Sequence, residues 1–199
     1  MPDVLTFDAA THRYTFGGRI VPSVTQILAG VGMYDFGHAS RETLAAAAER
    51  GHIVHTYIEW HERGTLDEES VDPALAGYFR AYLAAKEAGE LPAGSPSRIE
   101  TMVYSDKYGY AGTLAQMWGT SWINDLKTCP PDPAHGLQKS AYWLAEHPDM
   151  ADRPERLTAT YLTAEGFFRV VEYPYEPLAW LAVLADYNWR RKNGKIKGS

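Results

Sequence analysis

Asp125 and Lys127 stand two residues apart in the segment YGYAGTLAQMWGTSWINDLKT, the most informative stretch of the chain. Alternate residues of a β-strand point to the same face, so a strand here would place the carboxylate and the ammonium side by side. Charged groups in an otherwise apolar strand are costly without partners. A divalent cation for Asp125 and a phosphate or water for Lys127 would supply them. Spacing alone leaves a structural ion pair on a half-exposed strand as the alternative.

Two further features accompany this pair. Ala115 precedes Asp125 by ten residues and, across a turn at residues 119–120, would lie opposite it. Taken alone, Ala115 indicates a core position. Gln138 and Tyr142 are four residues apart, so on a helix they share one face. They would brace a site or touch a nucleic-acid backbone, or they would belong to an ordinary amphipathic helix surface.

His52 and His55 are three residues apart on a long predicted helix. Two helical histidines suit a zinc ion, but the single cysteine, Cys129, excludes a cysteine-built zinc or iron–sulfur site. His55 and Glu59, at i and i+4, would equally form a mutually satisfied pair.

The elements that must position these residues follow from periodicity and capping signals. Alternation predicts strands at residues 4–7, 12–16, 20–21, 98–105, 110–118, 121–127, 157–164 and 167–171. Helical patterns with caps and stops predict helices at residues 23–29, 41–63, 73–89, 134–146 and 176–191. This order predicts an α/β fold, bordering on α+β, in which helices flank a sheet.

Length, composition and net charge limit the fold and the functions that the chain can have. The chain has 199 residues and suits one domain. We expect a hairpin and helical part over residues 1–97 and a core over residues 98–199. The net charge of -6 opposes phosphate binding unless basic residues are concentrated. The C-terminal run with Arg190 and Arg191 is such a concentration, or simply a solvated helix end.

Cellular context is indicated by what the chain lacks. The N-terminus has neither a basic start nor an apolar stretch, so no signal peptide is predicted. No apolar run approaches the ~18 residues of a membrane span, so we expect no membrane association. One cysteine fits a reducing compartment, and we expect a cytoplasmic protein.

Together these segments resemble the RecB-like branch of the PD-(D/E)XK nucleases, notably small phage-type exonucleases. The resemblance covers residues 5–142. It rests on an opening block with Phe7, Asp8, His12, Tyr14, Gly18 and residues 21–28; a helical block with Gly51, Val54, His55, Ile58 and Glu59; a strand block with Ile99, Glu100, Tyr108, Tyr110, Ala111, Gly112 and Thr113; and a final block with residues 125–128, Gln138 and Tyr142. It implies a restriction-endonuclease-like core with a central mixed sheet.

The resemblance also implies a metal site. His55 is similar to the helical histidine ligand of RecB-like members, and Asp125 to the acidic ligand on the second strand. The main-chain carbonyl of Leu126 often completes that set, and Glu100 matches an acidic residue near the metal in some members. Mg²⁺ or Mn²⁺ is the expected cofactor.

Further roles follow from the same resemblance. Lys127 matches the catalytic lysine, and Gln138 and Tyr142 match an accessory motif. For DNA contacts the candidates are Arg41, Lys139, Arg190 and Arg191. Expected partners are DNA, a single-strand annealing protein and further copies of the chain, in the host cytoplasm if the protein is phage-encoded.

One position departs from the family pattern. The family expects aspartate where this chain has Ala115, while the surrounding motif is intact. Our hypothesis is that Ala115 is an introduced Asp→Ala substitution. We therefore expect a catalytically impaired deoxyribonuclease, an exonuclease rather than an endonuclease. The alternatives are a non-catalytic DNA-binding module with a degenerate nuclease fold, and an unrelated α/β protein whose Asp–Lys pair is structural.

Overall fold

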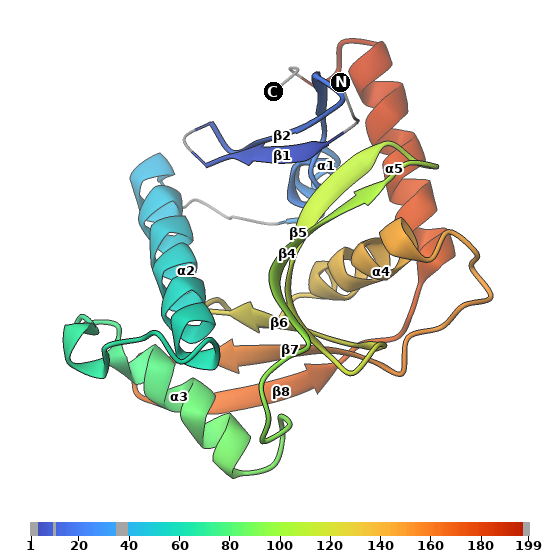
Figure 1. Cartoon of the computed structure of the whole chain (residues 1–199). Helices are drawn as coiled ribbons and strands as arrows, with labels where there is room; N and C mark the ends of the chain where they lie inside the picture. Colours follow the sequence, from blue (N-terminus) through green and yellow to red (C-terminus); the bar gives the residue numbers. More distant parts are fainter. Residues whose placement is uncertain (1–3, 10, 35–39, 197–199) are drawn as a thin grey trace.

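The computed structural model describes residues 4–9, 11–34 and 40–196, with Arg41 described in its backbone only. Figure 1 shows the arrangement of the elements. In chain order they are β1 (Leu5–Asp8), β2 (Arg13–Phe16), β3 (Arg19–Val21), α1 (Val24–Gly30), α2 (Arg41–Glu62), the 3₁₀ turn η1 (Glu68–Ser70), α3 (Ala76–Glu87), β4 (Arg98–Ser105), β5 (Tyr110–Trp118), β6 (Trp122–Lys127), α4 (Ala134–Glu146), β7 (Arg156–Leu162), β8 (Phe168–Glu172) and α5 (Pro177–Lys192).

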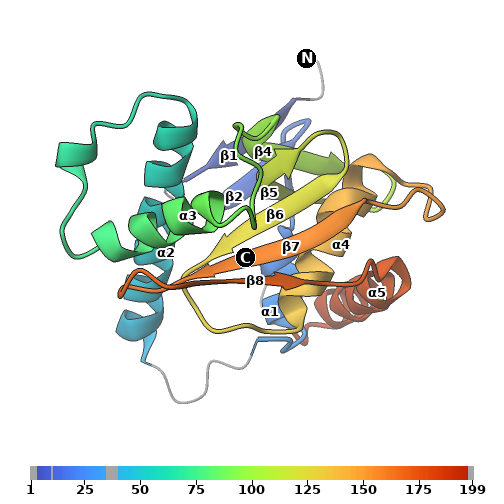
Figure 2. The same ribbon diagram turned by 90° about the horizontal axis from the view of Figure 1, so that it is seen from below.

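The strands form two sheets. The N-terminal sheet has the order β1-β2-β3 and is antiparallel, and the central sheet has the order β4-β5-β6-β7-β8. In the central sheet only β6 and β7 run parallel, and α4 makes the crossover between them. Helix α4 packs across one face and α3 packs on β7 and β8 at the other (Figures 1 and 2). The predicted α/β fold, a mixed sheet flanked by helices, is confirmed.

Local signals predicted most element ends closely. Ser23 caps α1 through a capping box: its Oγ accepts from Gln26 N at 3.1 Å, and its own N–H donates to Gln26 Oε1 at 3.0 Å. Helix α3 begins three residues later than predicted, because Asp72 holds the preceding residues in a turn by accepting a hydrogen bond from Ala74 N at 2.9 Å. The turn η1 was not predicted.

Successive residues of β6 serve opposite faces of the sheet. Asn124 belongs to a buried polar network beneath α3: its Nδ2 donates to Gln116 Oε1, and Gln116 Nε2 donates to the Tyr82 hydroxyl, both at 2.9 Å. Thr158 donates to Asn124 Oδ1 at 2.9 Å. Asp125 therefore points to the other face, toward α4.

The strands β5 and β6 pair over a short distance only. Their ladder joins Gln116–Trp118 to Trp122–Asn124, whereas β6 stays paired with β7 as far as Lys127. Figure 1 shows β4 and β5 bending away from β6 beyond this point. The divergence leaves the main chain after Asn124 without a strand partner on that side.

None of the helices in the described ranges combines the length and apolarity that a membrane crossing needs.

Candidate active site at the divergence of β5 and β6

A histidine of α2 meets the central sheet where β5 and β6 separate. Nε2 of His55 lies 2.9 Å from the main-chain oxygen of Leu126, and its Nδ1 lies 2.8 Å from Oε1 of Glu100. Elements α2, β4 and β6 thus each contribute one residue. The alternative pairing of His55 with Glu59 is wrong, because Glu59 forms an ion pair with Arg63 at 2.7 Å.

Both neighbours of the His55 ring are acceptors, so in this arrangement both ring nitrogens donate and the ring is charged. Burial would lower the pKa of His55, but the hydrogen bond and charge of Glu100, with the charge of Asp125, outweigh it and raise that pKa. A proton therefore lies between Nε2 and the Leu126 oxygen. Their 2.9 Å separation equals that of neighbouring ligands on an octahedral cation, about 3 Å for bonds of roughly 2.1 Å.

Glu100 adopts a backbone φ of 43°, a left-handed conformation that costs a non-glycine residue roughly 1–2 kcal/mol. The residues on either side of it pair regularly with β5, so Glu100 lies opposite Ala115 at an interruption of the ladder. Its carboxylate contacts the ring nitrogen of His55 that does not face Leu126. In this position Glu100 would orient the imidazole, and its expected role as a direct metal ligand stays a prediction.

Asp125 is buried and lies among three cations. Burial would raise the pKa of Asp125, but the charges of Lys127, Lys139 and His55 outweigh it and hold the pKa well below its ordinary value. Its Oδ2 lies 2.7 Å from Lys127 Nζ in an ion pair. A buried, ionised carboxylate that keeps its charge through neighbouring cations is also the kind of group that binds a metal ion.

Lys127 links β6 to α4. Its Nζ donates to Gln138 Oε1 at 2.9 Å, and Gln138 Nε2 donates to the Tyr142 hydroxyl at 2.7 Å. The amide can make both bonds only with its oxygen facing the ammonium. Gln138 and Tyr142 are 6% and 4% exposed, so their assignment to a solvent-facing helix surface is wrong. They brace Lys127 beside Asp125.

The ring of Tyr142 rests on Gly112 of β5. A Cβ at position 112 would come within 2.5 Å of Tyr142 Cε1, so glycine is needed for this approach. One residue further along β5, Thr113 Oγ1 and the Tyr14 hydroxyl lie 2.7 Å apart in a hydrogen bond. The glycine and threonine ahead of position 115 thus join α4 and the N-terminal sheet to the strand beneath the site.

Ala115 is the position of the site that carries no polar side chain. The β5–β6 ladder ends at the pair Gln116 and Asn124, so Ala115 and Asp125 are the residues next to its last pair. Ala115 is 3% exposed. Within the described ranges, no three His, Cys, Asp or Glu side chains gather closely enough to hold a metal ion.

The donor set nevertheless suits a hard divalent cation, although the set lacks one ligand. His55 Nε2, the Leu126 oxygen and Oδ2 of Asp125 are nitrogen and oxygen donors of the kind that Mn²⁺ and Mg²⁺ accept. Only the first two are within hydrogen-bond distance of each other, and the third lies within electrostatic reach of His55. A carboxylate at position 115 would supply a further oxygen beside Asp125.

Lys139 is not a DNA contact, because it is fully buried. Its Nζ donates to the His135 main-chain oxygen at 2.7 Å and lies 4.7 Å from the ring centroid of Tyr173. Burial lowers the pKa of Lys139 to about 7, an effect that Asp125 opposes and Lys127 reinforces. Lys139 is an internal cation of the site.

The other predicted DNA contacts lie away from the site or outside the described residues. Arg190 donates to Asp186 within α5 at 3.0 Å, and Arg191 is exposed on the same helix. Helix α5 packs on α4 and α1 (Figure 1), so the structure does not bring this basic run to Asp125. The side chain of Arg41 lies outside the described part of the chain.

Sequence reasoning missed that Lys139 is buried, and it assigned no role to His135. Nδ1 of His135 lies 2.8 Å from the Tyr161 hydroxyl. Burial, and then the charge of Lys127, lower the pKa of His135 to about 4, so the ring is neutral at neutral pH. The signal was present: residues 134–146 are mostly small or apolar, which is typical of a helix buried on most sides.

A solved structure of a protein from Eubacterium rectale, provisionally described as an exonuclease, is similar to this chain. The TM-score is 0.55 and the sequence identity 11%, over 90% of this chain and 77% of that chain. Similarity at this identity shows a shared nuclease-like fold and no more. No family model and no curated protein matches the sequence.

Proposed function

We propose that this chain is a metal-dependent nuclease that hydrolyses phosphodiester bonds in DNA, weakened by Ala115. The observation that carries the proposal is the meeting of His55 Nε2 and the Leu126 oxygen next to ionised Asp125, with the ammonium of Lys127 alongside. The nuclease-like fold shared with the E. rectale protein supports nuclease action, while exonuclease rather than endonuclease action stays a prediction from the sequence resemblance.

His55, Asp125 and the carbonyl of Leu126 would hold Mg²⁺ or Mn²⁺, and the histidine nitrogen favours tolerance of Mn²⁺. A cation bound there would polarise a phosphate oxygen and lower the pKa of a bound water. Glu100 accepts the proton on Nδ1 of His55, so a cation that displaces the Nε2 proton would be bound by the lone pair of Nε2.

Lys127 supplies a compact positive charge at the same place. Gln138 and Tyr142 fix its Nζ, so the ammonium does not need to be ordered when substrate arrives. It is placed to donate to a phosphate oxygen or to orient the attacking water. A preorganised donor of this kind typically contributes about 10²–10³-fold in rate.

The test is Ala115→Asp, assayed on linear DNA labelled at either end and on circular DNA, with Mg²⁺ or Mn²⁺. We expect cleavage of linear DNA to rise by about a thousandfold or more, and a chelator to abolish it. Ala115→Asn is the matched control, because it has the same shape without the charge. Lys127→Ala in the Ala115→Asp background should bind DNA without cleaving it. If Ala115→Asp cleaves no DNA under any of these conditions, the proposal fails.

Ala115 itself favours a second candidate, a DNA-binding module that has the nuclease fold and no catalysis. In that case Ala115→Asp would bind DNA and release no nucleotides with either metal. A single-strand annealing protein and further copies of this chain stay predicted partners, which co-purification and sedimentation of the full chain would test.

A further inference from the structure

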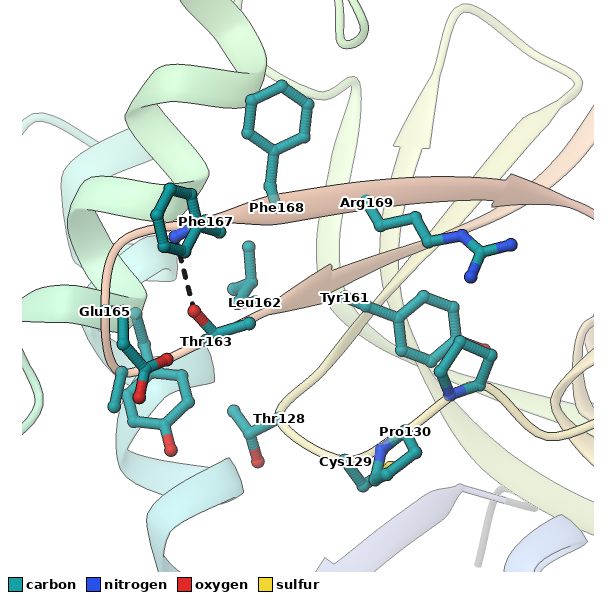
Figure 3. A pocket seen from close by; sticks show the side chains of 13 residues that line it. Thr128, Cys129, Pro130, Tyr161, Leu162, Thr163, Glu165, Phe167, Phe168 and Arg169 are labelled. Carbon is teal, nitrogen blue, oxygen red and sulfur yellow. Dashed lines mark hydrogen bonds between the residues drawn. The ribbon is translucent and has the colours of Figure 1, made fainter.

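A cavity of about 480 Å³ lies beside the site, between the β7–β8 turn and the loop after β6 (Figure 3). Thr128 and Cys129, which directly follow Lys127, line one side of it, and residues of β7 and β8 line the other. The volume falls within the roughly 300–1,000 Å³ that ligand pockets commonly have. Nothing in the proposed hydrolysis uses this cavity.

A row of side chains connects the cavity to the site. The β6–β7 ladder pairs Lys127 with Tyr161, and the β7–β8 ladder pairs Tyr161 with Arg169. Directly paired residues share a face of the sheet. With neighbouring strands about 4.8 Å apart, the row has a cation at each end, about 10 Å from one another. Figure 3 shows Arg169 and Tyr161 side by side at the cavity.

The row offers both a positive charge and ring surfaces. Arg169 is exposed, and its guanidinium forms no hydrogen bond or ion pair with any residue of the described ranges. The Tyr161 ring forms the floor of the cavity: it is 5% exposed, and its hydroxyl contacts both His135 and Tyr173. Phe167 stands at the rim and is 71% exposed. Ring faces beside an unpaired guanidinium are the components with which proteins hold single-stranded nucleic acid.

Two side chains of opposite charge lie at the two ends of the cavity. Figure 3 shows Glu165 at one end and Arg169 at the other. The carboxylate repels a phosphate and the guanidinium attracts one, so an entering nucleotide would direct its phosphate toward Arg169 and away from Glu165. Arg169 lies on the same face of the sheet as Lys127.

We propose that this cavity is a subsite for one unstacked nucleotide of a single-stranded DNA end, with its phosphate on Arg169 and its base against Phe167, above the floor formed by Tyr161. The inference rests on the proposed nuclease function and deepens it by naming a single-stranded substrate. Bases within a duplex are stacked on their neighbours, so their faces are not available to these rings.

The test is binding without cleavage. A fluorescently labelled short oligothymidylate and a blunt duplex are titrated with the chain carrying Ala115, in EDTA. Arg169→Ala and Phe167→Ala should each weaken oligothymidylate binding by about tenfold. Arg169→Ala should also lower the slope of log K against log salt by about 0.7, the value for one phosphate contact to a single strand.

Matched controls are Arg153→Ala and Leu178→Ala. Arg153 precedes β7 and Leu178 follows β8, so both lie at the ends of these strands remote from the cavity. Each control should bind oligothymidylate as the unsubstituted chain does. Arg169→Lys keeps the charge and should keep most of the affinity. Because Arg169 and Phe167 are exposed, their substitution should leave the fold intact, which circular dichroism checks.

The outcomes separate this inference from the proposed function. Weaker oligothymidylate binding by Arg169→Ala and Phe167→Ala, with unchanged duplex binding, supports the subsite. Equal binding by Arg169→Ala, Phe167→Ala and both controls overturns it, even if Ala115→Asp cleaves DNA. Equal losses on single strand and duplex overturn the single-stranded assignment. Absence of DNA binding by every protein, together with no cleavage by Ala115→Asp, overturns both.

Discussion

Lys139 is a fully buried lysine within electrostatic reach of an ionised aspartate. A lysine of the unfolded chain has a pKa of about 10.4, while in the folded chain burial lowers the pKa of Lys139 to about 7. Between these values the unfolded state binds more protons, so stability rises with pH across this window. The cost of burying the charge is complete below about pH 7.

Lys139→Met should therefore stabilise the fold by on the order of 2 kcal/mol at about pH 6, and the gain should be clearly smaller at about pH 9. Denaturant unfolding at the two pH values measures this difference. Lys192→Met, at the exposed end of α5, is the control and should change little at either pH. A gain of the same size at both pH values would contradict the explanation.

Glu100 supports His55 through charge as well as geometry. Its hydrogen bond and charge outweigh burial and raise the pKa of His55. A raised histidine pKa contributes stability that is complete below the unfolded value of about 6.5, and that is lost as pH rises through the folded value.

Glu100→Gln keeps an acceptor and removes the charge, so it should cost about 1 kcal/mol near pH 6 and less near pH 9. Thermal unfolding across this range tests the stability, and NMR titration should show a lower pKa for His55. A loss that does not vary with pH would mean that Glu100 acts by shape alone.

At the scale of elements, the site exists because β5 and β6 separate. Their ladder stops at Asn124, so the Leu126 carbonyl has no partner on β5 and His55 of α2 occupies the gap. Helix α4 covers the face of the sheet to which Asp125 points, and it contributes Gln138 and Tyr142 to the site. Its close approach to β5 depends on Gly112.

Gly112→Ala should displace the Tyr142 ring, weaken the Gln138–Tyr142 bond and destabilise the fold by ~2 kcal/mol. In an Ala115→Asp background it should also lower cleavage, because Lys127 loses its brace. Gly94→Ala is the matched control, since a Cβ there meets nothing within 4 Å. Unchanged stability of Gly112→Ala would show that α4 does not depend on this contact.

For the molecule as a whole, the site is a junction between α2 and the central sheet. Helix α2 packs on α3 and joins β4 and β6 through the hydrogen bonds of His55. A cation that binds His55, Asp125 and a carboxylate at position 115 would tie these parts together and stabilise only the folded state.

Mn²⁺ at about a hundred times its dissociation constant should stabilise Ala115→Asp by about 2.7 kcal/mol, a rise in Tm of roughly 5–10 °C for a chain of this size. Hydrogen exchange should slow in α2. Because the cation must displace the Nε2 proton of His55, binding should release protons and weaken as pH falls. Ala115→Asn is the control, and an equal rise in its Tm would argue against binding at position 115.

The sequence alone determined the local structure and the pairs that lie within one element. Alternation predicted β4 and β5 with the bounds observed, and Ser23 predicted the start of α1. The spacing of Asp125 and Lys127 placed both on one face. Such features depend on backbone periodicity and capping, which neighbouring residues specify.

Only the tertiary structure decided which distant groups meet and which are buried. His55 contacts Glu100 and Leu126 across 45 and 71 residues of chain. The same packing buries Lys139, which the sequence predicted as a DNA contact, and brings Glu100 against His55. These outcomes depend on where β5 separates from β6 and on which elements cover α4. Long-range packing determines both, and the periodicity within one segment carries no information about them.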